Sequence, residues 1–187
     1  MIPTLRFGFA LALRYGWVLA APALFVGLAA CLGLAYGAWG TLQLALPVML
    51  HASAGMLGSY VVHESGHFAA LRRCRGITAV SVETRALRLS LKPRGAIAPA
   101  EALAVALAGP LACFVTGAVL WAAVPQPGVA WWYLAHLILL APWCGDGQAA
   151  VTALRRMRRD GRDQRLSGRS SGDRLQPGPS RRGRQGS

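Results

Sequence analysis

The sequence predicts an all-α, polytopic membrane protein with about four transmembrane helices, a small cytoplasmic β-hairpin and a disordered, basic C-terminal tail. Three observations lead to this fold class. The 187-residue chain is 54% hydrophobic with a mean hydropathy of +0.39, which is too apolar for an ordinary soluble domain. Its apolar residues come in long blocks. Its basic residues are segregated, since none lies within 41–71 or 101–154.

Four apolar blocks are each long enough to cross about 30 Å of hydrocarbon as a helix that rises about 1.5 Å per residue. The first block is also longer than the roughly 7 to 15 apolar residues of a secretory signal peptide. We therefore interpret it as a retained span and not as a cleaved leader. The blocks are residues 17–38, 47–71, 102–124 and 129–150.

The connectors between these blocks differ in charge. Residues 40–43 and 125–128 carry none, whereas the connector 72–100 holds seven basic residues. Because basic loops remain on the cytoplasmic side, we expect this connector and both chain termini to lie in the cytoplasm. The predicted location is therefore the cell membrane, with several passes.

Within the basic connector, apolar and polar residues alternate with the period of two that is typical of amphipathic strands. The pattern predicts a small cytoplasmic hairpin that lies against the membrane face. The apolar members of the alternation are Val80, Val82, Leu87, Leu89 and Leu91.

The C-terminal tail carries 11 of the 20 basic residues, between Arg155 and Arg184. A basic segment beside a membrane span is expected to attract anionic lipid headgroups. Nucleic acid is not expected as a partner, because no aromatic residues are interleaved with this charge. From Gly161 onward the chain has almost no apolar residues and cannot bury enough surface to offset the entropy of ordering, so we expect disorder there.

Small residues recur at four-residue intervals in two of the blocks, which is how helix backbones approach each other closely in lipid. An alanine- and glycine-rich composition also scatters small residues, so the pattern serves only as support for a compact bundle. The residues are Gly55 and Ser59 in the second block and Gly109, Cys113 and Gly117 in the third.

The string His63-Glu64-Ser65-Gly66-His67 lies near the cytoplasmic end of the second block. Residues four apart on a helix point to nearly the same side, so His63 and His67 can offer both imidazoles to one zinc ion. Glu64 stands beside the first ligand, where it can act as the base for a water molecule. An ionisable residue inside a span costs about 2.5 to 3.5 kcal/mol on insertion scales, so we expect Glu64 to have a function.

Asp146 is expected to complete a site for one zinc ion per chain, since a catalytic zinc has three protein ligands and one open position. His63 lies about 24 Å along its helix from Pro47, at the outer edge of the second block. Asp146 lies about 22 Å from Trp131 in the fourth block, which runs in the opposite direction. The two residues therefore reach matching depths. The residues expected to break the fourth helix and turn Asp146 toward the metal are Pro142, Gly145 and Gly147.

Three other residues could act as ligands by residue type. His51 lies about 18 Å before His63 along a helix, and His136 lies about 15 Å before Asp146, so we interpret both as packed or interfacial histidines. Cys144 is close enough to Asp146 to be a rival or accessory ligand, although a buried cysteine is usually a small hydrophobe. The four cysteines show no CxxC pairing, and a disulfide framework is not expected.

These residues resemble the site-2 protease family of intramembrane zinc metallopeptidases, whose pattern is an HExxH in one span and an Asp-Gly in a later span. The Asp-Gly here is Asp146-Gly147, and the string AGPLA at 108–112 is similar to a further family segment. The matches cover residues 55 to 150, roughly. The resemblance implies that a membrane protein substrate is cut in or near a transmembrane segment, just inside the cytoplasmic face. It also implies Glu64 as the catalytic residue and His63, His67 and Asp146 as zinc ligands.

The chain differs from the family's pattern at three positions. Cys113 and Ile138 stand where much of the family has asparagines, and Gln148 stands where a second glycine often follows Asp-Gly. Amides at the first two positions could hold a substrate strand or stabilise an oxyanion. An alternative function is therefore a catalytically weak or inactive zinc-binding membrane scaffold of the same fold.

A second alternative, from another class, is a haem or electron-transfer membrane protein that uses the four histidines. Paired haem ligands should face each other from different helices at like depth, and the spacing offers no convincing pair. The sequence therefore predicts a zinc metalloendopeptidase in three parts. These are an N-terminal segment with the first span at 1–40, the metallopeptidase core at 41–154 and the basic tail at 155–187.

Overall fold

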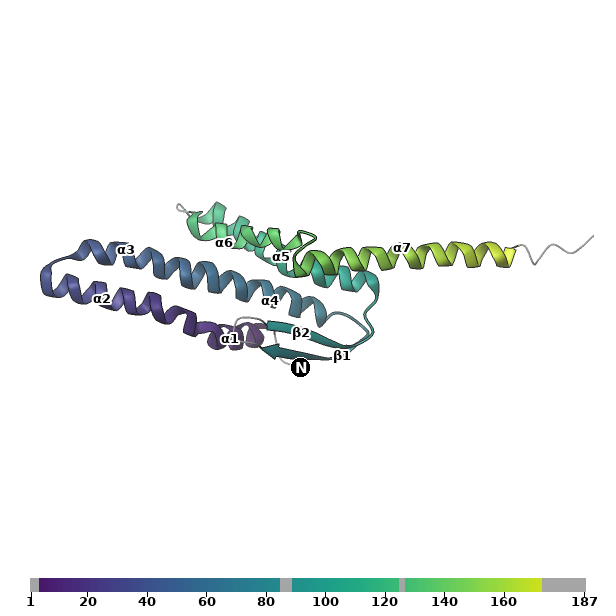
Figure 1. Cartoon of the computed structure of the whole chain (residues 1–187), viewed down its shortest axis with the longest axis horizontal. Coiled ribbons are helices and arrows are strands. Elements are labelled where there is room, and N and C mark those ends of the chain that lie inside the picture. The colour runs from purple at the N-terminus through teal and green to yellow at the C-terminus, as the bar shows by residue number, and fades with distance from the viewer. Residues whose placement is uncertain (1–3, 85–88, 125–126, 173–187) are drawn as a thin grey trace, which may run out of the picture.

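The computed structural model describes residues 4–84, 89–124 and 127–172, and Figure 1 shows an elongated, mostly helical molecule. The helices run side by side along its long axis, and one two-stranded sheet lies beside the N-terminal helix. The elements in chain order are α1 (Thr4–Tyr15), η1 (Gly16–Leu19), α2 (Ala20–Tyr36), α3 (Trp39–Leu50), η2 (His51–Leu57), α4 (Gly58–Leu71), β1 (Ile77–Thr84), β2 (Leu89–Gly95), α5 (Pro99–Ala123), η3 (Pro127–Val129), α6 (Ala130–Leu134), η4 (Ala135–Leu140) and α7 (Gly145–Gly172).

Three described helices are long and apolar enough to cross a membrane, and a bent pair gives a fourth span if its two parts are counted as one. Many of their large apolar side chains face outward, such as Leu24 at 74% and Leu34 at 77% exposed. Outward-facing apolar residues are what a bilayer solvates, so the prediction of a helical membrane protein with about four spans agrees with the structure. The three helices are Thr4–Tyr36, Trp39–Leu71 and Pro99–Ala123, and the bent pair is Ala130–Leu140 with Gly145–Asp163.

The first span is longer than the sequence predicted. Helix runs without a gap from α1 through η1 into α2, because the apolar stripe of α1 packs against α4. Phe7 stacks on Phe68 with ring centroids 4.3 Å apart, and Tyr15 meets Tyr60 edge to face at 5.3 Å. The helix ends at Gly37, whose φ of 67° suits a residue without a Cβ.

The chain turns at residues 37–38, so the predicted connector at 40–43 is wrong: Trp39 already begins α3. The second span then continues through η2, which is a turn of π-helix, into α4. Pro47 lies inside α3, where it has no backbone N–H to donate to the preceding turn.

Small residues bring α4, α5 and α6 close together, as the four-residue pattern suggested. A Cβ on Gly66 would lie only 2.6 Å from the carbonyl oxygen of Ala108. The buried thiol of Cys113 donates to the Ser59 carbonyl oxygen at 3.2 Å. A Cβ on Gly117 would meet Tyr133 and Leu134 at 3.0 Å. Close backbone approach of this kind holds α4 firmly against α5.

The candidate fourth span is broken, as Pro142, Gly145 and Gly147 predicted. η4 ends at Leu140, α7 starts at Gly145, and the two parts are bent by 41°. At Gly147 an added Cβ would strike the Ala141 carbonyl group, so the connection is too tight for a larger residue. The break places Asp146 in the first turn of α7.

The predicted hairpin is present. β1 and β2 pair antiparallel, with Val82 opposite Leu91 and Thr84 opposite Leu89. Leu87, the remaining member of the predicted alternation, lies outside the described residues. Figure 1 shows the hairpin beside α1, close to the point where α4 finishes.

The predicted disorder from Gly161 onward does not hold over residues 161–172, because α7 continues as a helix to Gly172. Arginine is a good helix former, so a segment can be too polar to form a core and still be helical. Figure 1 shows α7 extending well beyond the other helices. Residues 173–187 lie outside the described residues.

Candidate metal centre

The two histidines of the HExxH string lie one turn apart on α4 and point to the same side of the helix. Their Nε2 atoms are 3.0 Å apart, and the rings meet edge to face. His63 is 5% and His67 is 9% exposed. Two buried imidazoles with converging nitrogens are an arrangement typical of metal ligands.

The carboxylate of Asp146 reaches this pair from α7. Its Oδ2 lies 3.1 Å from His63 Nε2, and its Oδ1 lies 3.4 Å from His67 Nε2. Thus the structure brings together the three side chains that the sequence predicted as ligands, from helices 79 or more residues apart in the chain. They form one of two groups of His, Cys, Asp or Glu among the described residues that could hold a metal ion.

The spacing of the donor atoms fits zinc. Bonds of about 2.0 to 2.1 Å in tetrahedral geometry place neighbouring ligand atoms roughly 3.3 to 3.4 Å apart. The three observed separations are 3.0, 3.1 and 3.4 Å. Two nitrogens and a carboxylate oxygen are also a donor set of catalytic zinc sites. The residues therefore suit zinc in both distance and chemistry.

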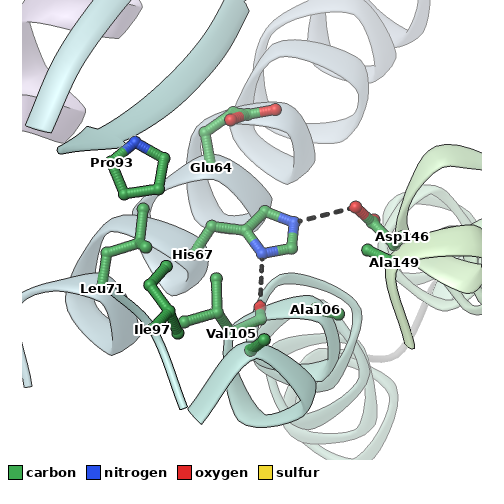
Figure 2. Close-up of a pocket in the computed structure, with 10 residues that line it drawn as sticks. Glu64, His67, Leu71, Pro93, Ile97, Val105, Ala106, Asp146 and Ala149 are labelled. Atoms are coloured by element: carbon green, nitrogen blue, oxygen red, sulfur yellow. Dashed lines mark hydrogen bonds and ion pairs between the residues drawn. The ribbon is translucent and has the colours of Figure 1, made fainter. Parts of the chain in front are cut away.

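A second contact fixes the orientation of His67. Its Nδ1 lies 2.7 Å from the carbonyl oxygen of Val105 on α5, as Figure 2 shows. A carbonyl oxygen only accepts, so Nδ1 carries the proton and Nε2 keeps its lone pair on the side of Asp146. Such an outer partner is characteristic of metal-ligating histidines. Gly109, one turn further along α5, makes room for this ring, because a Cβ there would strike His67.

A cavity of about 280 Å³ opens beside the cluster and is lined by Glu64, His67 and Asp146. In Figure 2, Glu64 and His67 project from the same helix, with Asp146 facing the imidazole from the other side. Most of the remaining wall is apolar, and it includes Pro93 at the end of the hairpin and Ile97. Glu64 therefore lines the cavity without belonging to the donor group.

His51 and Cys144, two of the residues considered beside the predicted ligands, belong to neither group of potential ligands in the described residues. His51 accepts a hydrogen bond from Trp132 Nε1 at 3.0 Å. Cys144 belongs to neither metal-binding group found in the described part of the chain, so the structure does not favour it as a ligand.

His136 is placed differently from the sequence expectation. Its ring centroid lies 5.0 Å from that of His63. The estimate of about 15 Å from Asp146 assumed a straight helix, and the break at 141–144 removes that assumption. His63, Cys113 and His136 form the second group, with ligand atoms within 4.8 Å of one another. The break at Pro142 could have predicted that His136 lies near His63, but it entered only the prediction for Asp146.

The contact between His63 and His136 also bears on the haem alternative. Rings 5.0 Å apart and tilted by 42° pack against each other, so no macrocycle fits between them.

No family model, curated protein or solved structure matches this chain.

Proposed function

We propose that this protein is an intramembrane zinc metalloendopeptidase, similar in its site to the site-2 proteases. The observation that carries the proposal is the convergence of His63, His67 and Asp146 at 3.0 to 3.4 Å beside a cavity that Glu64 lines. The site is built on helices long and apolar enough to cross a bilayer. Its expected substrates are peptide bonds in or near transmembrane segments of other membrane proteins.

Each residue has a distinct role in this proposal. His63, His67 and Asp146 hold zinc, which when bound acts as a Lewis acid on a carbonyl oxygen. Glu64 accepts a proton from the attacking water and then donates it to the leaving amine. Both histidines are buried, and the Val105 carbonyl keeps His67 in the required tautomer.

The direct test uses the purified full-length protein in detergent. We expect one zinc ion per chain and cleavage of single-span reporter proteins whose transmembrane helix contains helix-breaking residues. Helix-breaking residues matter because a helical peptide bond must unwind before it can enter the cavity. Protein without zinc, or with zinc but without cleavage of any such reporter, contradicts the proposal.

Zinc without cleavage would support the second candidate, a zinc-binding scaffold. One observation favours it: neither Cys113 nor Ile138 stands in the cavity wall. Cys113 is buried with its thiol bonded to Ser59, and Ile138 is 65% exposed. Gln148 is bonded to the Trp143 carbonyl oxygen at 3.3 Å, so it does not supply an amide to the wall either.

The hairpin is proposed as the docking site for the unwound substrate. A two-stranded sheet has an outer edge on each strand, and an extended peptide can add to such an edge through main-chain hydrogen bonds. Pro93 of β2 lines the cavity, so a peptide bound along this strand runs toward Glu64.

Deletion of the hairpin tests this role. Gly76 and Ala96 adjoin at its base, so residues 77–95 can be replaced by two glycines with little strain on α4 and α5. We expect zinc content to stay at the level of the intact chain while reporter cleavage falls at least tenfold. As a control, the paired polar residues Ser81 and Lys92 are replaced with Thr and Arg, which keeps the strands. An unchanged cleavage rate after the deletion removes the docking role.

We also propose that both termini and the hairpin lie in the cytoplasm of a multi-pass cell-membrane protein. The basis is the charge asymmetry between connectors, together with an even number of spans when the bent pair is counted as one. The exposed arginines at the start of the tail, Arg155, Arg156, Arg158 and Arg159, would then face anionic lipid headgroups.

Reporter fusions test this topology. A reporter that works only outside the cytoplasm is expected to be active when inserted after Gly128. A reporter that works only in the cytoplasm is expected to be active when fused after Ser187. Cysteine labelling of intact cells at the same two places provides the control. A cytoplasmic signal at Gly128 contradicts the span assignment, and a signal from outside the cytoplasm at Ser187 contradicts the assignment of the bent pair as one span.

A further inference from the structure

The two ligand histidines differ in how their second ring nitrogen is satisfied. His67 Nδ1 donates to the Val105 carbonyl oxygen at 2.7 Å. His63 Nδ1 is buried and has no hydrogen-bond partner among the described residues. Because His63 Nε2 faces Asp146 and His67, Nδ1 is the nitrogen left over on the other edge of the ring.

This unpaired nitrogen matters for metal binding, so the inference rests on the zinc site proposed above. A neutral imidazole that offers the Nε2 lone pair to a metal carries its proton on Nδ1. Metal-ligating histidines almost always donate this proton to an acceptor, which fixes the ring and raises the basicity of the ligand. A buried donor without an acceptor would instead weaken the site.

Two side chains stand beside His63, since one ring nitrogen of His63, the Cys113 sulfur and one ring nitrogen of His136 lie within 4.8 Å of one another. Cys113 is the poorer acceptor, because its thiol proton is donated to Ser59 and a neutral sulfur accepts weakly. His136 donates from Nδ1 to the Trp132 carbonyl oxygen at 2.8 Å. That bond fixes its tautomer and leaves the Nε2 lone pair as an acceptor.

We propose that His136 is the positioning residue for His63: it accepts the Nδ1 proton of His63 through one bridging water and so holds the ring for zinc. A water with two partners about 2.8 Å away spans roughly 4.6 Å, and the ring centroids of His63 and His136 lie 5.0 Å apart. Trp132 in turn positions His136, so the chain of contacts runs from the backbone of α6 to the metal.

His63, Cys113 and His136 are less suited to bind a second metal ion than to form the hydrogen-bonded arrangement proposed here. His63 would have to give one ring nitrogen to each metal, so it would lose its single N–H proton and bind as the imidazolate anion. Cys113 would also have to give up its bond to Ser59 and become a thiolate inside the bundle, where burial disfavours the charge.

The test measures zinc affinity of the purified full-length chain in detergent, by competition with a chelator. His136→Leu removes the acceptor and is expected to weaken zinc binding 10- to 100-fold, the usual effect of losing an outer partner. His136→Gln keeps an acceptor oxygen and is expected to remain within about threefold of the unsubstituted chain, since the bridging water still has a partner. His51→Leu is the matched control, because His51 also bonds to Trp132 but stands outside both metal-binding groups.

The visible absorption spectrum of bound cobalt provides a second readout, which a change in side-chain packing alone does not alter. At saturating cobalt, His136→Leu is expected to shift the visible absorption bands, whereas His51→Leu leaves them in place. The proposal is overturned if His136→Leu binds zinc as tightly as the unsubstituted chain, or if His136→Gln is as weak as His136→Leu. It is also overturned if Cys113→Ala weakens binding as much as His136→Leu, since the three residues would then act as ligands. Failure of the unsubstituted chain to bind zinc overturns the proposed function itself, and this inference with it.

Discussion

Replacement of Glu64 by glutamine should leave zinc bound and lower reporter cleavage by about 10²- to 10⁴-fold, the usual contribution of general acid–base catalysis. Glutamine keeps the size and the hydrogen-bonding capacity of the side chain but cannot accept the proton of the attacking water. Glu64 lines the cavity without belonging to the donor group, so the three ligands remain in place. The measurements are metal analysis and the cleavage rate of a membrane-embedded reporter.

Glu101→Gln is the matched control for this substitution. Glu101 lies at the start of α5, where its carboxylate accepts from the backbone N–H groups of Arg75 and Ala98. It lies outside the cavity wall, and the amide oxygen of glutamine can still accept. We expect Glu101→Gln to retain at least half of the cleavage rate. If Glu64→Gln is equally active, the metallopeptidase mechanism must be abandoned.

Replacement of Asp146 by alanine should lower zinc occupancy and cleavage together. The substitution removes an oxygen that lies 3.1 Å from His63 and another that lies 3.4 Å from His67. Two histidines alone hold zinc weakly, and loss of a first ligand is expected to cost more than the 10- to 100-fold of an outer partner. Metal analysis after dialysis against a chelator, combined with the cleavage assay, separates this outcome from that of Glu64→Gln.

Asp160→Ala is the corresponding control on the same helix. Asp160 is exposed on α7 and lies 14 residues beyond Asp146, about 21 Å along the helix, so it should not change zinc content. Full zinc and full turnover in Asp146→Ala would show that the third ligand is another residue. Cys144→Ala and Cys113→Ala would then be compared. Cys144 was the alternative ligand that the sequence suggested, and Cys113 belongs to the second group of potential ligands.

The sequence by itself determined the local parts of this protein. The i, i+4 spacing of His63 and His67 fixes both imidazoles on one side of α4, because helix geometry depends only on neighbouring residues. Pro142 and its glycines break the fourth span for an equally local reason. The period-two alternation marked the hairpin, and the length of the apolar blocks marked the helices that can cross a membrane.

Other features depended on contacts between distant segments. The start of the first helix was missed because α1 is stabilised by packing Phe7 onto Phe68 of α4, 61 residues away. The helical course of α7 over residues 161–172 was missed because low hydrophobicity limits core formation, not helix formation. Matching depths made Asp146 a reasonable third ligand. Depth does not determine how each helix is rotated about its own axis, or how far apart two helices lie.

Only the tertiary structure decided which side chains meet at the site. Close packing of α4 on α5 through Gly66 and Gly109 gives His67 its carbonyl partner and its orientation. The 41° bend turns Asp146 toward the two histidines, and the chain before the bend carries His136 to within 5.0 Å of His63. A distance estimated from a rise of about 1.5 Å per residue is valid within one straight helix but not across a break. A bend changes the direction of the helix axis, which residue numbers do not record.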